Sequence, residues 1–439
     1  MKRICPWLLA TLTCVPAVGR VSGADITELK SRRERAAKAF SDGVLLLHSR
    51  GGADFVLDGY REEAAFYYVT GLENSPDVIL AIEGKTGQCW LFVPQGSSRR
   101  TAEIEPGKPA EEKLGVDHVV EWGELEGFLE REIAKGAKLY YKPDVATLPQ
   151  NLTPAKDPRT PCWIQVLQQR WPKAEFRPVG RKLTTLMAVE SRSERHDSEM
   201  AARATAFAFF AGMRATHPGA SQRLVELAVV DACWKQARGV SFWPWAMAGP
   251  NGVFPKPFES DSRYDHLDSR LQSGDLVRLD VGCEWNHYQG DLGRTIPVSG
   301  HFSDEQREVW NIFVATYRAV ARELKEGLTE DEAFEIWRTE LLSHRNSAKT
   351  AFARQAIASW SDRENVPYWQ MHTMNLDAGY IEGTLRAGMV IDLEPIASIG
   401  GQGYYLEDMF LIDKNAAELL TPGLPYTAEE IEAEMAARH

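Results

Sequence analysis

Two aspartates lie in neighbouring apolar segments that have the pattern of strands. Asp280 falls in residues 275–282, and Asp291 falls in residues 289–297. If the chain reverses between Trp285 and Asn286, the two aspartates become direct cross-strand neighbours, with Cβ atoms about 4.5–5.5 Å apart. The spacing therefore predicts a hairpin that holds two carboxylates side by side.

Two glutamates repeat this arrangement further along the chain. Glu394 falls in residues 388–397 and Glu407 in residues 403–412, and both segments are strand-like. The midpoint between the two glutamates lies between Gly400 and Gly401, where a hairpin turn forms readily. The sequence therefore predicts a second hairpin with two facing carboxylates.

Facing carboxylates suggest a bound cation. Like charges opposite each other destabilise a sheet unless a cation lies between them. One such pair is typical of a solvated edge, but two pairs in apolar strands favour a metal site over solvated edges. His372 is not selected by chemistry alone, because a lone histidine is more often structural than ligating.

The scaffold for these strands has two regions of different character. Residues 25 to about 180 alternate between helices and strands, which is typical of an α/β domain. We expect an amphipathic helix over residues 25–40 and strands over 43–48, 78–82, 88–94 and 138–141. Residues 142–161 contain five prolines, so we expect a loop or insertion there.

From about residue 181 the pattern changes to long helices, with strands between and after them. Helices are expected over residues 198–216 and 221–237, and two more are expected to start near residues 303 and 329. The last two begin with the capping-box pairs Ser303–Gln306 and Thr329–Glu332. The expected fold class is therefore α+β.

The first 24 residues have the pattern of a cleaved export signal. They combine a basic start, a mostly apolar stretch over residues 4–18 and small residues just before Asp25. The apolar stretch is short for a membrane anchor. We therefore expect an exported protein, periplasmic or extracellular, without a membrane anchor; the remaining length suits two or three domains.

Charge and cysteine usage narrow the function classes. Loss of residues 1–24 would change the formal net charge from −12 to −15, because three basic residues and no acidic residue are lost. So acidic a protein is a poor candidate for binding nucleic acid or anionic membranes. The remaining cysteines contain no CxxC pair, which argues against cysteine metal ligands. An oxidising compartment allows a disulfide, but the sequence does not choose its pairing. These cysteines are Cys89, Cys162, Cys233 and Cys283.

The acidic hairpins resemble those of the aminopeptidase P and prolidase family. Residues 279–285 (LDVGCEW) and 288–300 resemble its aspartate hairpin, and residues 302–307 resemble the helix start that follows. Residues 385–395 (LRAGMVIDLEP) and 405–408 (YLED) look like its two glutamate strands. The resemblance extends over nearly the whole chain after residue 24. It includes residues 66–72 and 91–94, which are similar to the amino-terminal domain shared with creatinase. It also includes residues 248–251, which are similar to the family's loop that enters the catalytic domain.

The resemblance implies a creatinase-like domain over residues 25–180 and a pita-bread catalytic domain over residues 181–439. It also implies that two divalent metal ions are bound, with one glutamate, Glu394, also shuttling a proton. Such oxygen-rich ligation with one imidazole suits manganese, cobalt, iron or zinc, of which we expect manganese. The ligands would be Asp280, Asp291, His372, Glu394 and Glu407.

The implied reaction is hydrolysis of the amino-terminal residue from a peptide with proline in second position, or of an Xaa-Pro dipeptide. The expected partner is thus a small peptide or another small molecule. Relatives are often dimers or tetramers, so we also expect a homo-oligomer.

The chain departs from the family pattern where accessory histidines are expected. Tyr368 and Gly379 stand at two such positions, and Pro255-Lys256-Pro257 replaces a His-Tyr pair. Tyr405 stands where an arginine is usual. Groups of this kind support charge in the transition state, and losing one can cost roughly 10²–10³ in rate. We therefore expect weak activity on ordinary Xaa-Pro peptides.

Several alternatives follow from these departures. Lys256, His287 and Tyr405 are candidate substrate-binding residues that could replace the missing groups, and His266 is a further candidate. For the two histidines the alternative is a surface-loop position. Two other functions stay open: a reaction on a small non-peptide molecule, or metal binding without catalysis. The complete ligand set counts against the last of these.

Overall fold

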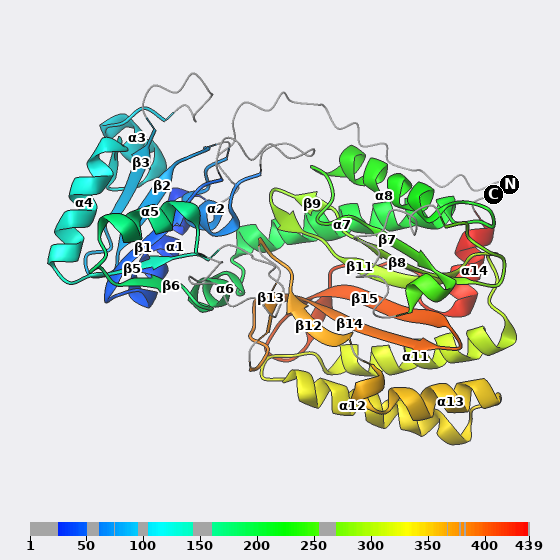
Figure 1. Ribbon diagram of the computed structural model, residues 1–439. Helices are drawn as coiled ribbons and strands as arrows, with labels where there is room; N and C mark the ends of the chain where they lie inside the picture. Colours follow the sequence, from blue (N-terminus) through cyan, green and yellow to red (C-terminus); the bar gives the residue numbers. More distant parts are fainter. Residues whose placement is uncertain are drawn as a thin grey trace, which may run out of the picture.

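The computed structural model describes residues 25–50, 61–73, 75–94, 104–143, 160–253, 269–366, 368–376, 379–381 and 383–437. These residues form two units, each built on one large sheet, and the expected α+β fold class is confirmed (Figure 1). The predicted export signal, Lys256 and His266 lie outside the described residues, as does most of the proline-rich segment. No helix in the described part of the chain is long and apolar enough to cross a membrane.

The amino-terminal unit is a mixed six-stranded sheet with the order β4-β3-β2-β1-β5-β6. Its central strand β1 is a continuous apolar run that is buried on both faces, as expected for a strand with neighbours on both sides. The strands are β1 (Gly43–His48), β2 (Ile79–Glu83), β3 (Cys89–Val93), β4 (His118–Glu121), β5 (Lys138–Tyr141) and β6 (Phe176–Pro178). The helices around it are α1 (Ile26–Ala39), α2 (Ala64–Thr70), α3 (Lys108–Leu114), α4 (Gly123–Ala134) and α5 (Cys162–Arg170). The short helix α6 (Lys182–Met187) follows and leads to the second unit.

The carboxyl-terminal unit is an eight-stranded sheet with the order β13-β12-β14-β15-β11-β8-β7, in which β16 also pairs with β15. Its larger strands are β7 (Trp245–Ala248), β8 (Leu276–Val281), β11 (Leu292–Pro297), β12 (Tyr368–Thr373), β14 (Val390–Ile399) and β15 (Gln402–Ile412). The shorter ones are β9 (Glu284–Trp285), β10 (Tyr288–Gln289), β13 (Gly379–Tyr380) and β16 (Ala417–Leu419), of which β9 and β10 form a separate ribbon.

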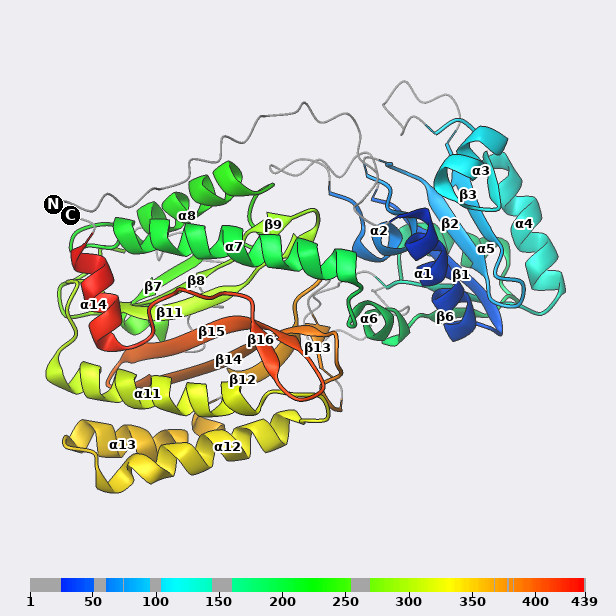
Figure 2. The same cartoon turned by 180° about the vertical axis from the view of Figure 1, so that it is seen from behind.

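Long helices cover this sheet in two groups, α7 and α8 over the half that contains β7, β8 and β11, and α11 to α13 over the half that contains β12, β14 and β15 (Figures 1 and 2). The helices are α7 (Arg192–Ala215), α8 (Gln222–Gln236), α11 (Asp304–Glu323), α12 (Glu330–Ser343), α13 (Ala351–Trp360) and α14 (Ala428–Ala436). The two predicted capping boxes, at Ser303 and Thr329, are confirmed at the starts of α11 and α12.

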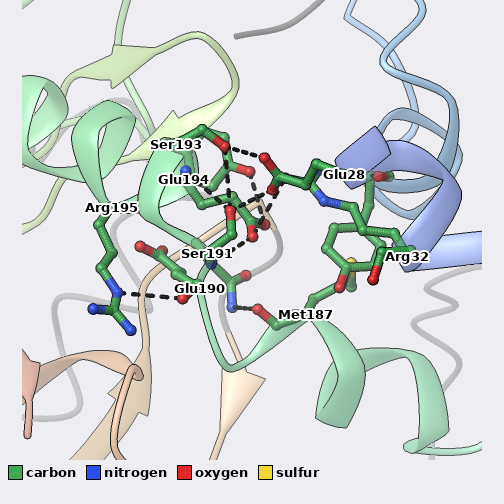
Figure 3. Close-up of polar contacts among 12 residues, drawn as sticks. Glu28, Arg32, Met187, Glu190, Ser191, Ser193, Glu194 and Arg195 are labelled. Carbon is green, nitrogen blue, oxygen red and sulfur yellow. Dashed lines mark hydrogen bonds and ion pairs between the residues drawn. The ribbon is translucent and has the colours of Figure 1, made fainter. Parts of the chain in front are cut away.

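The helix α7 begins six residues before the predicted start at residue 198. A third capping box explains the difference, since Ser191 and Glu194 cap each other's backbone N–H groups. The same residues join the two units (Figure 3). The Ser191 hydroxyl donates to the Glu28 carboxylate of α1, as does the Ser193 hydroxyl at 2.5 Å. Arg32 of α1 is buried between Glu28 and Glu194.

Replacement of Ser191 by alanine is expected to lower the free energy of unfolding by about 1–2 kcal/mol, because a capping side chain is lost. Ser193→Ala is the matched control, since it also removes a bond to Glu28 but leaves the capping box in place. Denaturant unfolding of both variants checks the difference. A Ser191→Ala protein that is no less stable than Ser193→Ala would contradict the role given to the cap.

Strand alternation places the acidic residues on one face of the second sheet. Leu279, Leu393 and Leu406 belong to the large apolar core that also includes residues of α7 and α11. Because adjacent residues of a strand point to opposite faces, Asp280 and Glu394 point away from these helices, and so does Glu407. We call this side of the sheet the acidic face. It carries Asp280, Asp291, His372, Asp392, Glu394 and Glu407.

Candidate metal centre

The aspartate hairpin turns one residue later than the sequence predicted. Asn286 and His287, with φ of 49° and 71°, form the two-residue turn between β9 and β10. Asparagine tolerates the left-handed conformation that such a turn needs, which favours this position. Asp280 therefore pairs with Gly293, and the prediction that it pairs directly with Asp291 is wrong. Asp291 lies two residues away along the opposite strand, where it remains a diagonal neighbour.

The register of the glutamate hairpin is as predicted. Gly400 and Gly401, with φ of 59° and 74°, form the turn between β14 and β15. The pairs on either side, Leu393 with Asp408 and Ile396 with Tyr405, place Glu394 opposite Glu407. Glu407 also pairs with Gly293 of β11. Its strand β15 therefore lies between β14, which carries Glu394, and β11, which follows Asp291.

His372 joins these carboxylates from the neighbouring strand β12. Its Nε2 atom lies 3.5 Å from Glu394 Oε2 and 3.6 Å from Glu407 Oε1. Across the strand pair, His372 faces Asp392 of β14. The structure thus brings the five predicted ligands onto one face, from strands that are far apart in sequence.

Burial makes this cluster electrostatically costly. The exposed fractions of its five carboxylate residues are all 9% or less. Burial, followed by the charge of Glu407, raises the pKa of Asp280, Asp291 and Glu394 above the usual range. Burial lowers the pKa of His372, but the nearby carboxylates of Glu394 and Glu407 raise it more, so the net shift is upward. A buried cluster of like charges needs counter-cations.

Unsatisfied oxygens show where a cation fits. Asp291 Oδ1, Glu407 Oε1 and both carboxylate oxygens of Asp392 are buried without a hydrogen-bond partner among the described residues. Asp291, His372, Asp392 and Glu407 each offer a ligand atom, and these atoms lie within 4.8 Å of one another. Buried polar atoms are rarely left without partners, so this donor set of oxygens and one imidazole fits a divalent metal ion.

Three residues of the acidic face were missed in the sequence. Gln370 donates from Nε2 to Glu394 Oε2 at 2.6 Å and orients that carboxylate. Asp392 lies two residues before Glu394, and Arg278 lies two residues before Asp280. Each therefore points to the same face of the sheet as the residue that it precedes. Charged residues at this period in otherwise apolar strands are the sequence signal that could have identified both.

Tyr405 lies within the centre. Its hydroxyl donates to Glu407 Oε2, and its ring is so close to Gly293 that a Cβ atom at that position would lie 1.7 Å from a ring carbon. The guanidinium of Arg278 lies 4.6 Å from the ring centroid. Glycine at 293 therefore makes room for the tyrosine, and Arg278 lies beside it. A role of Tyr405 in substrate binding stays a prediction.

The other predicted substrate residues are placed differently. His287 packs against Tyr67 of α2 with the two rings tilted and their centroids 4.3 Å apart, and its Nε2 lies 3.7 Å from Glu73 Oε1. These contacts join the hairpin turn to the amino-terminal unit. Gly379 pairs with Thr373 and accepts a hydrogen bond from its hydroxyl, while the backbone of Tyr368 pairs with Ile396.

Comparisons with known proteins identify the two units. Residues 198–414 match metallopeptidase family M24, and residues 29–140 match the aminopeptidase P N-terminal domain. The Xaa-Pro aminopeptidase of Escherichia coli K12 is 25% identical over 407 residues, which is 86% of this chain and 89% of that protein. The mitochondrial intermediate cleaving peptidase 55 of Arabidopsis thaliana is 23% identical over 95% of this chain and 84% of its own length. An Xaa-Pro dipeptidase of Pyrococcus horikoshii is 28% identical over 59% of this chain and 70% of its own length.

The fold also matches solved structures. Aminopeptidase P of E. coli with the inhibitor Pro-Leu superposes with a TM-score of 0.74, and the match covers 94% of this chain and 99% of that one at 22% identity. At that identity the likeness concerns the fold. The two-unit architecture with a pita-bread second unit, expected from the sequence, is thereby confirmed.

Proposed function

Because the chain belongs to metallopeptidase family M24 and carries an aminopeptidase P N-terminal domain, we propose that it is a metal-dependent hydrolase that removes the amino-terminal residue from peptides with proline in second position. The observation that carries this proposal is the convergence of the five expected ligands on the acidic face, where unpartnered buried oxygens surround His372. The relatives named Xaa-Pro aminopeptidase and Xaa-Pro dipeptidase supply the substrate class.

The proposed centre holds two divalent ions through Asp280, Asp291, His372, Glu394 and Glu407. We propose manganese, with cobalt, zinc or iron as alternatives, because all of them suit carboxylate ligands with one imidazole. When bound, two such ions lower the pKa of a water molecule and polarise the scissile carbonyl.

The residues of this chain supply the remaining chemistry. We propose, from the family resemblance, that Glu394 moves a proton between the attacking water and the leaving amine. Gln370 fixes its orientation through the 2.6 Å hydrogen bond. Tyr405 holds Glu407 through its hydroxyl, and the planar guanidinium of Arg278 packs over the Tyr405 ring. The low exposure of these side chains keeps bulk water away from the reacting atoms and strengthens their electrostatic interactions.

Turnover of ordinary Xaa-Pro peptides is expected to be lower than that of the E. coli Xaa-Pro aminopeptidase by roughly 10²-fold or more, since losing one charge-stabilising donor already costs about that much. The reason is the combined absence of the usual basic groups at Tyr368, Gly379 and Tyr405. Catalysis comes from interactions that are stronger in the transition state, so the loss should appear in kcat as well as in KM.

The measurement is kcat and KM on an Xaa-Pro peptide series with added manganese, run beside the E. coli enzyme. Equal kcat values would show that other groups have taken over the missing roles. No hydrolysis of any member of the series would refute the proposed function. A panel of small amides would then test the alternative, a reaction of the same centre on a non-peptide molecule.

We also propose that the protein is exported to an oxidising compartment, periplasmic or extracellular, as the pattern of residues 1–24 predicts. Cys233 of α8 and Cys283 after β8 form a disulfide, which supports this location because such bonds are rare in reducing compartments. Amino-terminal sequencing of the native protein should find a start near Ala24 or Asp25, and an intact Met1 would contradict the proposal. The homo-oligomeric state is likewise a proposal, which light scattering of the purified protein tests.

A further inference from the structure

Asp392 is a buried carboxylate that none of the described residues satisfies. It lies on β14, two residues before Glu394, and is 0% exposed. Neither of its oxygens has a hydrogen-bond partner among the described residues. The residue beside it, Leu393, is apolar and points into the core on the opposite face. An aspartate left this way in a sheet interior is costly unless a ligand completes its bonding.

Asp408 shows how the same sheet treats a structural aspartate. It is also 0% exposed, but on the helix-covered face of β15. Arg294 Nη2 and Thr421 Oγ1 donate to its Oδ1 at 2.8 Å, and Tyr426 donates to its Oδ2 at 2.7 Å. Its two oxygens are therefore fully engaged by protein groups. The contrast indicates that Asp392 has a partner other than the described side chains.

The geometry points to the identity of that partner. Asp392 faces His372 across the β12–β14 pair. One of its oxygens lies within 4.8 Å of the ligand atoms offered by Asp291, His372 and Glu407. A single cation placed among these atoms would contact all four side chains.

We propose that Asp392 is a sixth protein ligand of the centre and binds the divalent ion that Asp291, His372 and Glu407 also hold. The inference rests on the proposed function, because that function supplies the metal ions. It adds a ligand outside the set of five predicted from the sequence. The ion bound there has one imidazole and three carboxylates, a set that favours a cation with a preference for oxygen, such as manganese.

The positive charge of Arg278 compensates the additional negative charge of Asp392. The five carboxylates of the acidic face carry five negative charges when ionised, against four positive charges on two divalent ions. Arg278 is 1% exposed, lies 3.5 Å from Asp280 through Nη2, and leaves Nε and Nη1 without a hydrogen-bond partner among the described residues. Its single positive charge completes the balance, with the imidazole neutral as a ligand.

The test is manganese binding to metal-free protein, measured by calorimetry and by electron paramagnetic resonance of the ion. The wild-type protein should bind two ions. In Asp392→Asn, one of them should bind at least about tenfold more weakly, the lower limit for loss of a metal-supporting group. Asp231→Asn, an exposed carboxylate on α8, is the control and should match the wild type. Two unchanged affinities in Asp392→Asn would overturn the inference.

Thermal unfolding distinguishes whether Asp392 acts as a metal ligand or as a structural residue. Loss of an unpaired buried charge should leave metal-free Asp392→Asn as stable as the metal-free wild type or more stable. Manganese should then raise its unfolding temperature less than it raises that of the wild type. The opposite pattern, a metal-free variant that is less stable and gains as much from manganese, would contradict a ligand role.

Crystals of zinc-loaded wild-type protein give an answer that does not depend on any variant folding. An Asp392 oxygen is expected about 2.0–2.2 Å from one zinc ion, the usual zinc–carboxylate distance. Two bound ions with Asp392 in contact with neither would overturn this inference and leave the proposed function intact. A wild-type protein that binds no metal would contradict the proposed function itself.

Discussion

Removal of the divalent ions is expected to abolish hydrolysis and to lower the stability of the folded protein together. The acidic face would then hold five buried carboxylates, with His372 and Arg278 as the basic side chains beside them among the described residues. Ligand binding stabilises a native state by about 2.7 kcal/mol when the free ligand is present at 100 times its dissociation constant. Two ions should therefore contribute several kcal/mol, and the unfolding temperature should fall clearly when a chelator removes them.

The measurement is thermal unfolding and peptide hydrolysis before chelation, after chelation and after manganese is restored. Restored activity separates loss of the ions from irreversible unfolding. The Ser193→Ala protein, which is altered where α7 meets α1, should show the same response. A chelated protein that keeps both its unfolding temperature and its activity would rule out a metal-dependent site on this face.

Glu394→Gln is expected to lower kcat/KM by roughly 10²–10⁴, the usual contribution of a positioned general acid or base. Glutamine keeps the shape and one ligand oxygen of the side chain, but it neither accepts nor carries the proton. The hydrogen bond from Gln370 would meet an amide in place of a carboxylate. The loss should appear mainly in kcat, because the proton is moved in the transition state.

Glu418→Gln is the matched control for this substitution, since Glu418 is an exposed carboxylate on β16 of the same sheet. It should leave kcat/KM unchanged. Metal content should be measured for both variants, so that loss of an ion is distinguished from loss of the proton shuttle. A Glu394→Gln protein with two ions and unaltered kcat would show that another group moves the proton.

The glutamate hairpin could be predicted from sequence because its turn chemistry and its acidic residues gave the same register. Gly400 and Gly401 adopt the positive φ that a two-residue turn requires, and the midpoint between Glu394 and Glu407 falls between them. In the aspartate hairpin these two signals disagree. The turn forms at Asn286 and His287, and the assumption that Asp280 and Asp291 must face each other placed the turn one residue too early.

The ligand environment could be predicted only in part. Motif resemblance supplied the five expected ligands, but it gave no reason to examine residues that the motifs leave variable. The spacing of Asp392 and Arg278 two residues before Glu394 and Asp280 was a signal in the sequence, but their place beside the centre follows from the alignment of the strands. The contact of His287 with Tyr67 was equally inaccessible, because it joins residues of two units that are separated by more than 200 positions in sequence.

The most direct test of the account is a manganese titration of metal-free protein, with release of the amino-terminal residue from an Xaa-Pro peptide as the readout. The account predicts no release without metal and a rise in activity that levels off at two equivalents of manganese per chain. Activity that is independent of manganese, or no release at any ratio of metal to protein, would contradict it.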